Sequence, residues 1–224
     1  MWLSDPNWWV QAIVAIGTLL VAFIALFGDV IKRQLFPPNL SLKLKSDSGE
    51  SINLSLKDPK TKSVNEAKAR YYHLLVNNKG KTTATNTGVY MTSILLRGAG
   101  GDWHQKWNGD APLSWRNGAL YPLLREVGAT EIDADFFYLV EDKWLEVCVV
   151  DGARVNNIPT DSEPFRPGRW RNKVEMIVTV QAKSTESKSA PYMFYVDWDA
   201  DWEIGDKEIL HHLKIKHITD INIV

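Results

Sequence analysis

The longest apolar run of the chain lies near its N-terminus. Residues 8–27 (WWVQAIVAIGTLLVAFIALF) contain no charged residue and no proline, and Gln11 and Thr18 are their only polar side chains apart from the indoles. A helix of this length is about 30 Å long, which matches the hydrocarbon thickness of a bilayer. A helix also satisfies its own backbone N–H and C=O groups in lipid. The run therefore predicts a membrane-spanning helix.

The flanking charges distinguish a permanent anchor from a cleaved signal peptide. Residues 1–31 contain no Lys or Arg, the first cations are Lys32 and Arg33, and no Ala-x-Ala motif follows the run. A signal peptide has a positive N-terminal region, a shorter apolar core and a small-residue cleavage site. An uncleaved helix is therefore favoured. Because positively charged flanks stay in the cytoplasm, we expect the N-terminus outside and residues 32–224 inside.

One face of the predicted helix carries small and polar residues. Its members are spaced four and three apart, which places them on one side of a helix: Gln11, Ala15, Thr18, Ala22, Ala25 and Asp29. Small residues allow close helix approach in lipid, and polar ones hydrogen-bond across the contact. This association face predicts self-association, with a narrow conducting bundle as a further alternative. Chance also produces such a stripe, because Ala and Thr are common in membrane helices, and Asp29 is expected to pair locally with Lys32 and Arg33.

After Pro37 and Pro38, which end the helix, the pattern changes to alternating apolar and polar positions. Turn residues rich in Gly, Asn, Ser and Pro separate the alternating segments. We expect strands at 39–45, 51–57, 70–78, 84–97, 130–140, 143–150, 173–182, 191–198 and 213–218. A short helix at 207–213 follows the N-cap residue Asp206, whereas 58–69 reads as a loop or short helix and 102–128 as irregular.

This order predicts two regions, a transmembrane helix with its juxtamembrane segment at residues 1–35 and a soluble domain at 36–224. About nine antiparallel strands with regular turns indicate a β-sandwich, with a small β-barrel as the alternative. The chain is thus mainly β, with one or two short helices besides the anchor. The 45% hydrophobic and 24% charged content is ordinary for a folded protein.

Charge and cysteine content exclude two classes of protein. All 26 Lys and Arg residues lie at or after Lys32, and only two of the 27 acids, Asp5 and Asp29, precede it. The soluble part is therefore nearly neutral, which argues against a general nucleic-acid binder. The single cysteine, Cys148, has no second cysteine with which to form an internal disulfide. This excludes a disulfide-stabilised scaffold and fits a reducing compartment. Its apolar neighbours indicate a buried, unreactive side chain.

The segment 197–208 has the spacing of a calcium loop. Asp197, Asp199 and Asp201 take positions 1, 3 and 5, and Glu208 takes position 12. Position 6, where such a loop needs glycine, holds Trp202, and a strand rather than a helix precedes it. The alternative, which we favour, is the end of a strand followed by an acidic turn. We therefore expect no resident metal or cofactor.

The other polar and aromatic clusters fit structural roles. His211 and His212 point in different directions on a helix and poorly share a metal ion. Trp103, Trp107 and Trp115 are expected to pack in the core, the alternative being an exposed binding face. The basic segment with Arg166, Arg169 and Arg171 reads as a solvated rim or a contact to an anion or lipid headgroup. No nucleotide, hydrolase, kinase or zinc-protease motif is present, so no catalytic residue is predicted.

Two segments resemble a known group. Residues 71–94 (YYHLLVNNKGKTTATNTGVYMTSI) resemble the "L-x-V-x-N-x-G…A-x-N-x-x-V" strand pair of immunoglobulin-like sandwiches in bacterial surface and membrane proteins. Residues 165–182 (FRPGRWRNKVEMIVTVQA) are similar to the "P-G-x-Y-x-x-x-V-x-V" strand entry of the same group, with Trp170 at the aromatic position. The resemblance implies a bacterial single-pass protein of the inner membrane with a cytoplasmic immunoglobulin-like domain. Such a fold by itself implies no activity.

Three hypotheses follow for function. The first is a non-enzymatic, membrane-anchored β-sandwich that senses or binds a partner and self-associates through its helix. The second is a membrane-disrupting or pore-forming bacterial antiviral effector gated by the β domain. The third is a hydrolase without a recognisable motif. The expected partners are the bilayer, further copies of this chain, and a cytoplasmic protein or small ligand of unidentified chemistry.

Overall fold

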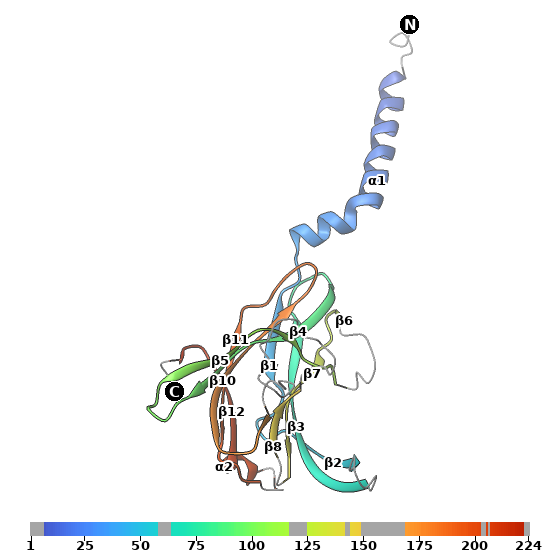
Figure 1. The fold of residues 1–224 in the computed structure, drawn as a ribbon. Helices are drawn as coiled ribbons and strands as arrows, with labels where there is room; N and C mark the ends of the chain where they lie inside the picture. The colour runs from blue at the N-terminus through green and yellow to red at the C-terminus, as the bar shows by residue number, and fades with distance from the viewer. Residues whose placement is uncertain are drawn as a thin grey trace.

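The computed structural model describes residues 7–57, 64–116, 125–141, 144–148, 169–202, 205 and 207–221. Within them the chain is mainly β, with an apolar helix at the N-terminal end and two antiparallel sheets, one of which curls into half a barrel. The helix projects from one end of the sheets, so its first turns lie far from the β domain (Figure 1). The predicted fold class, an N-terminal helix followed by an antiparallel β-sandwich, is confirmed.

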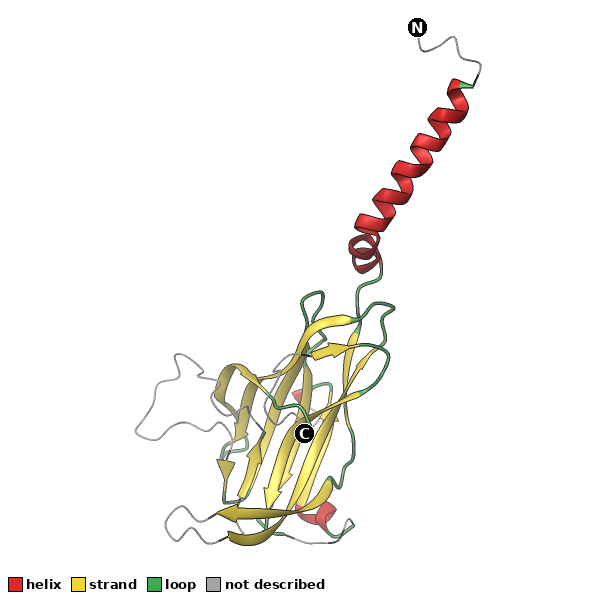
Figure 2. Cartoon of the chain, turned by 90° about the vertical axis from the view of Figure 1, so that its right-hand side faces the viewer, coloured by secondary structure: helices red, strands yellow, loops and turns green. Residues whose placement is uncertain are grey.

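Helix α1 (Trp8–Leu35) continues beyond the apolar run to the two prolines. None of its residues is buried, and it is long and apolar enough to cross a membrane. The helix bends in its C-terminal part, which then runs across the direction of the first part (Figures 1 and 2). Gly28 lies in this part, and glycine is a common site of helix bending. The described part of the chain therefore leaves the apolar surface of α1 uncovered.

The first sheet is organised around the long strand β3 (Val64–Asn78). Strands β1 (Leu40–Leu44) and β2 (Glu50–Lys57) pair end to end along one edge of β3, because a turn with Gly49 at φ +70° separates them. The other edge of β3 pairs with β7 (Ile132–Val140), which is followed by β8 (Trp144–Val147) and β9 (Arg169–Trp170).

The second sheet has the order β12 (Leu213–Ile218), β11 (Tyr192–Trp198), β10 (Val174–Lys183), β4 (Ala84–Arg97) and β5 (Trp103–Pro112). The short strand β6 (Arg125–Val127) pairs with the start of β4. Helix α2 (Ile209–His212) precedes β12 and packs with Ile209 buried. The predicted C-terminal strand at the sheet edge is thus confirmed. Figure 2 shows the strands of both sheets below the helix.

The core lies between the two sheets, on the alternate positions that the sequence marks as apolar. Phe136 of β7 packs edge to face on Phe194 of β11, with ring centres 5.1 Å apart, and so joins the two sheets. Trp107 and Trp115 are buried as expected, whereas Trp103 is half-buried and packs against Tyr195. The core has no contribution from α1.

The structure corrects several element predictions. Residues 103–112, expected to be irregular, form the edge strand β5, whose pairing with β4 shifts register twice. These bulges break the strict alternation that a strand prediction requires. Strand β3 begins at Val64, inside the expected loop, and α2 is shorter than predicted. Asp206 and Arg166 lie outside the described residues. The sequence also predicts a turn at 163–170, of which only Arg169 and Trp170 are described, and these two form strand β9.

Candidate functional site

The segment that joins α1 to β1 is held by the turn between β3 and β4. Thr82 Oγ1 donates to the carbonyl oxygen of Phe36 at 2.6 Å, and the Lys79 N–H donates to that of Asn39 at 2.8 Å. A Cβ on Gly80 would lie 2.7 Å from backbone atoms of Pro37 and Pro38. Only glycine therefore allows this turn to pack so closely on the linker.

Asn78, the last residue of β3, stabilises the same turn through its side chain. Its buried side-chain amide donates to the carbonyls of Thr82 at 2.7 Å and Val127 at 3.0 Å. Its amide oxygen accepts the N–H groups of Asn39 at 3.0 Å and Gly80 at 2.9 Å. All four hydrogen-bonding positions of the amide are occupied, which defines one geometry for the linker.

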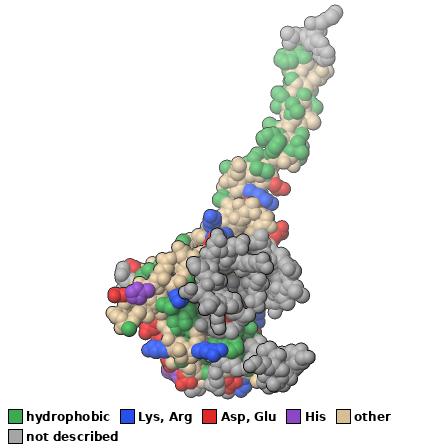
Figure 3. Space-filling view, viewed as in Figure 1, with side chains coloured by type: hydrophobic (Ala, Val, Ile, Leu, Met, Phe, Trp, Pro, Cys, Tyr) green, Lys and Arg blue, Asp and Glu red, His purple; other side chains and the backbone are tan. Residues whose placement is uncertain are grey.

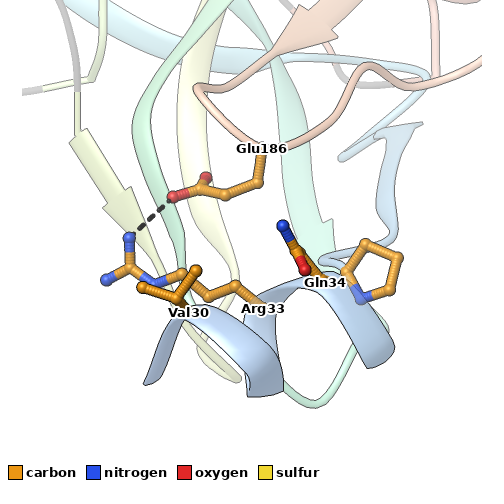
Figure 4. A pocket seen from close by; sticks show the side chains of 5 residues that line it. Val30, Arg33, Gln34 and Glu186 are labelled. Atoms are coloured by element: carbon orange, nitrogen blue, oxygen red, sulfur yellow. Dashed lines mark hydrogen bonds and ion pairs between the residues drawn. The ribbon is translucent and has the colours of Figure 1, made fainter. Parts of the chain in front are cut away.

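Glu186, in the turn between β10 and β11, ties α1 to the second sheet. Its carboxylate lies 3.2 Å from Arg33 Nη1 (Figure 4) and accepts hydrogen bonds from the backbone and hydroxyl of Thr85 on β4. Partial burial would raise the pKa of Glu186, but the Thr85 and Ser184 hydrogen bonds outweigh it and hold this pKa below its ordinary value. Glu186 is therefore ionised at neutral pH.

A cavity with a mainly apolar lining separates the end of α1 from this turn. It has a volume of about 430 Å³ and is lined by Val30, Arg33, Gln34, Pro37 and Glu186. Figure 4 shows the helix residues facing Glu186 across the space. We call the whole set of contacts the anchoring junction: the Phe36–Asn39 linker, Asn78, Gly80, Thr82, Thr85, Arg33 and Glu186. It fixes the helix to both sheets.

The predicted association face lies along α1 with every member exposed: Gln11, Ala15, Thr18, Ala22, Ala25 and Asp29. Thr18 Oγ1 donates to the carbonyl oxygen of Val14 at 2.8 Å, so its hydrogen is used within the helix. The expected local pair of Asp29 does not form among the described residues, because Arg33 pairs with Glu186 instead. The alanines and the free amide of Gln11 remain available for a second helix.

The acidic residues of segment 197–208, which has the spacing of a calcium loop, make separate local contacts. Asp199 lies 2.9 Å from His212 Nδ1 and accepts the N–H of Asp201, while Asp201 accepts the N–H of Trp202. Asp197 is on β11 opposite Lys214, and Glu208 precedes α2 beside Gly205. Within the described parts of the chain, no three His, Cys, Asp or Glu side chains gather where they could hold a metal ion.

A second polar cluster lies on the outer side of the first sheet. The buried His73 lies with Nδ1 3.0 Å from Asp135 Oδ1, and Ser114 Oγ donates to Asp135 Oδ2 at 3.1 Å. The carboxylate thus lies between the hydroxyl and the imidazole. This differs from a catalytic triad, in which the imidazole itself accepts the serine proton. The nearby Asp133 pairs with Lys45 and Arg116, which connects β1 to β7.

The two sheets leave a seam where β1 lies beside β12. The groove there has a volume of about 420 Å³, with Leu42, Phe194 and Ile215 among its lining residues and the exposed Lys43 and Lys216 at its sides. Among the described strands, β1 pairs only with β3 and β12 only with β11. Lysines on such open edges hinder further strand pairing.

The residues of the anchoring junction were not identified from sequence. Asn78, Gly80 and Glu186 lie in polar segments whose composition predicts a turn but not its partner. Arg33 and Glu186 are 153 residues apart, so no local pattern signals their contact. The two resembling strands 71–78 and 84–94 lie in different sheets and do not pair with each other.

Comparison with known proteins does not assign a family. No protein-family model, no curated protein and no solved structure matches this chain. Any functional conclusion therefore depends on the physical features of the helix, the anchoring junction and the sandwich.

Proposed function

We propose that this protein is a non-enzymatic interaction and sensing module, anchored in a bacterial inner membrane by α1 and self-associating through it. In this arrangement the N-terminus lies outside and the β-sandwich lies in the cytoplasm. The main support for this proposal is that α1 has no buried residue and that its length and hydropathy suit a bilayer. An apolar surface of this size needs lipid or another helix to cover it.

The anchoring junction supports a defined orientation of the domain. The linker is held by Thr82 and Lys79, and Arg33 pairs with Glu186 of the second sheet. A domain on a free linker would turn independently of its anchor. Here, a partner bound by the sandwich shares its orientation with the helix, which suits a sensing module.

Self-association is tested on the association face. Replacing Ala15, Ala22 and Ala25 by Leu adds bulk where helices would approach most closely. We expect chemical crosslinking in native membranes to give dimers or larger species for the unaltered chain, and mainly monomers for the triple variant. The chain should stay in the membrane fraction after an alkaline wash in both cases.

The matched control is Ile13→Phe with Leu20→Phe, which adds bulk to the opposite side of α1 at about 100° per residue. This variant should crosslink like the unaltered chain. If the triple Leu variant keeps its crosslinked size, helix-mediated association is wrong. If the alkaline wash removes the unaltered chain, membrane anchoring itself is wrong.

A second candidate function is a membrane-disrupting antiviral effector gated by the β domain. The anchoring junction favours this function, because a rearrangement of the sandwich would turn the attached helices. Overexpression of the full chain should then release a dye trapped in cells, whereas a chain that begins at Phe36 should not. Absence of leakage under conditions that trigger the domain would exclude this role.

A further inference from the structure

The last part of α1 lies at the depth of the lipid headgroups if residues 8–27 span the hydrocarbon. The remaining eight residues add about 12 Å of helix, and a headgroup layer is roughly 5–8 Å thick. Because the helix bends, this part runs across the axis of the first part rather than straight away from it (Figures 1 and 2). With residues 8–27 across the hydrocarbon, residues 28–36 would run along the membrane surface.

This segment has the composition of an interfacial helix. Val30, Leu35 and Phe36 are between 45% and 67% exposed, and Lys32 and Arg33 are exposed beside them. Apolar side chains of such a helix enter the acyl boundary, while the cations stay among the headgroups. The segment is thus suited to contact both parts of a lipid molecule.

The turn between β3 and β4 adds two cations at the same place. Lys81 Nζ lies 5.2 Å from the centre of the Phe36 ring, and Lys79 donates its N–H to the linker at Asn39. The N–H of Phe36 bonds to the carbonyl of Lys32, which places Lys32 one helical turn before Phe36. Figure 3 shows Lys or Arg side chains at the base of the helix, with acidic side chains beside them.

We call Lys32, Arg33, Lys79 and Lys81 the basic collar. Glu186 neutralises Arg33, but the ammonium groups of Lys32, Lys79 and Lys81 make no ion pair with any described residue. Asp29 is the one carboxylate on the neighbouring turn of α1, so the collar keeps an excess of positive charge. Exposed basic residues beside a membrane are attracted to its anionic lipids.

We propose that the basic collar binds the phosphate of an anionic phospholipid headgroup, held between Lys32 and Lys81 beside Phe36. This inference rests on the proposed membrane anchoring. The acyl chains of the same lipid lie along Val30 and Leu35, and the Thr82 and Lys79 contacts hold the collar in position. The collar thereby sets how the sandwich faces the membrane surface.

The test uses the full-length chain in mild non-ionic detergent. Native mass spectrometry measures how much phosphatidylglycerol or phosphatidylcholine each protein molecule retains at equal lipid concentrations. We expect clear preference for phosphatidylglycerol. Each lysine near an anionic surface contributes a factor of about five in affinity, so Lys32→Gln with Lys81→Gln should weaken phosphatidylglycerol binding about 25-fold.

The matched control is Lys106→Gln with Lys173→Gln, two exposed lysines far along the sheets from the junction. It should bind phosphatidylglycerol like the unaltered chain, and circular dichroism should show all proteins folded. Equal retention of both lipids, or equal losses in the control and collar variants, would overturn the inference. A glycerol 3-phosphate titration distinguishes the sources, because competition at equal concentration would show that the acyl chains contribute nothing and overturn the lipid assignment.

Failure of this inference is distinct from failure of the anchoring. A chain that resists the alkaline wash but shows no lipid preference keeps the anchor and loses only the headgroup site. A chain that the wash removes loses both.

Discussion

Glu186 is the residue on which the contact between helix and second sheet depends. Its side chain is 9% exposed, whereas that of Arg33 is 49% exposed. A half-exposed ion pair contributes under about 1 kcal/mol, but hydrogen bonds to a buried charge contribute roughly 1.5–3 kcal/mol. The Thr85 bonds therefore stabilise the junction more than the ion pair does.

Replacing Glu186 by Ala should lower the free energy of unfolding by about 2 kcal/mol, because the N–H of Thr85 loses its charged acceptor. Urea unfolding of the full chain in detergent micelles measures this. Glu126→Ala is the control, since Glu126 is exposed, and should change the free energy by less than about 0.5 kcal/mol. Equal effects of the two substitutions would refute the role of Glu186.

The lowered pKa of Glu186 predicts that the free energy of unfolding depends on pH. The pKa of Glu186 is lower in the folded protein than its ordinary value of 4.5, so its contribution is complete above that value and is lost as pH falls through the lowered pKa. The stability difference between the unaltered chain and Glu186→Gln should therefore shrink in acid. A difference that stays constant down to strongly acidic pH would contradict the assignment.

Cys148 should be chemically inert in the folded protein. It is buried, and desolvation followed by the charges of Asp135 and Glu146 raises its pKa well above the ordinary value. A maleimide should label it only after unfolding in urea, because the thiolate is the reactive form. Asn108→Cys places an exposed thiol on β5 and should label at once in the folded chain. Rapid labelling of Cys148 itself would show that the site opens.

At the scale of elements, the open edges at the seam carry their own protection. Lys43 on β1 and Lys216 on β12 are exposed beside the apolar groove. Charged residues at these positions oppose pairing with a strand of another molecule. We therefore expect these lysines to keep the edges of the seam from pairing with other chains.

Replacing Lys43 and Lys216 by Val should make a chain that begins at Phe36 form larger species, because the edges of β1 and β12 then lose the charges that oppose strand pairing. Size-exclusion chromatography and light scattering measure this change. Lys173→Val, just before β10, is the control and should leave the chain monodisperse. Identical elution of the edge variant and the unaltered chain would show that the lysines do not protect the edges.

At the scale of the whole molecule, helix α1 and the sandwich share no hydrophobic core. The core between the sheets contains no α1 residue. The linker, in contrast, belongs structurally to the sandwich, because Thr82, Lys79 and Asn78 hold Phe36 and Asn39. The boundary between the two parts therefore lies at the end of α1 rather than after the prolines.

A chain that begins at Phe36 should fold, remain in the supernatant and keep the circular dichroism of the β domain. A chain that begins at Leu40 loses three linker hydrogen bonds, so its free energy of unfolding should be lower by roughly 1.5–4.5 kcal/mol. Urea unfolding of both chains gives the comparison. Equal stabilities would show that the linker is not part of the folded domain.

Local patterns in the sequence determined the helix, most strands and the class of fold. An uncharged run of 20 residues and segments in which apolar and polar residues alternate are properties of neighbouring residues. They can therefore be recognised without the tertiary structure. The buried positions of Cys148, Trp107 and Trp115 followed from the same patterns. Strand β5 was missed because its bulges interrupt that period.

The tertiary structure alone decided the anchoring junction, the seam and the basic collar. Arg33 meets Glu186, Thr82 meets Phe36 and Lys81 meets the Phe36 ring across long stretches of chain. Such contacts depend on how two sheets stack and which turns meet at one end of the sandwich. Periodicity specifies which side of a strand is buried, but it carries no information about which distant turn lies beside it.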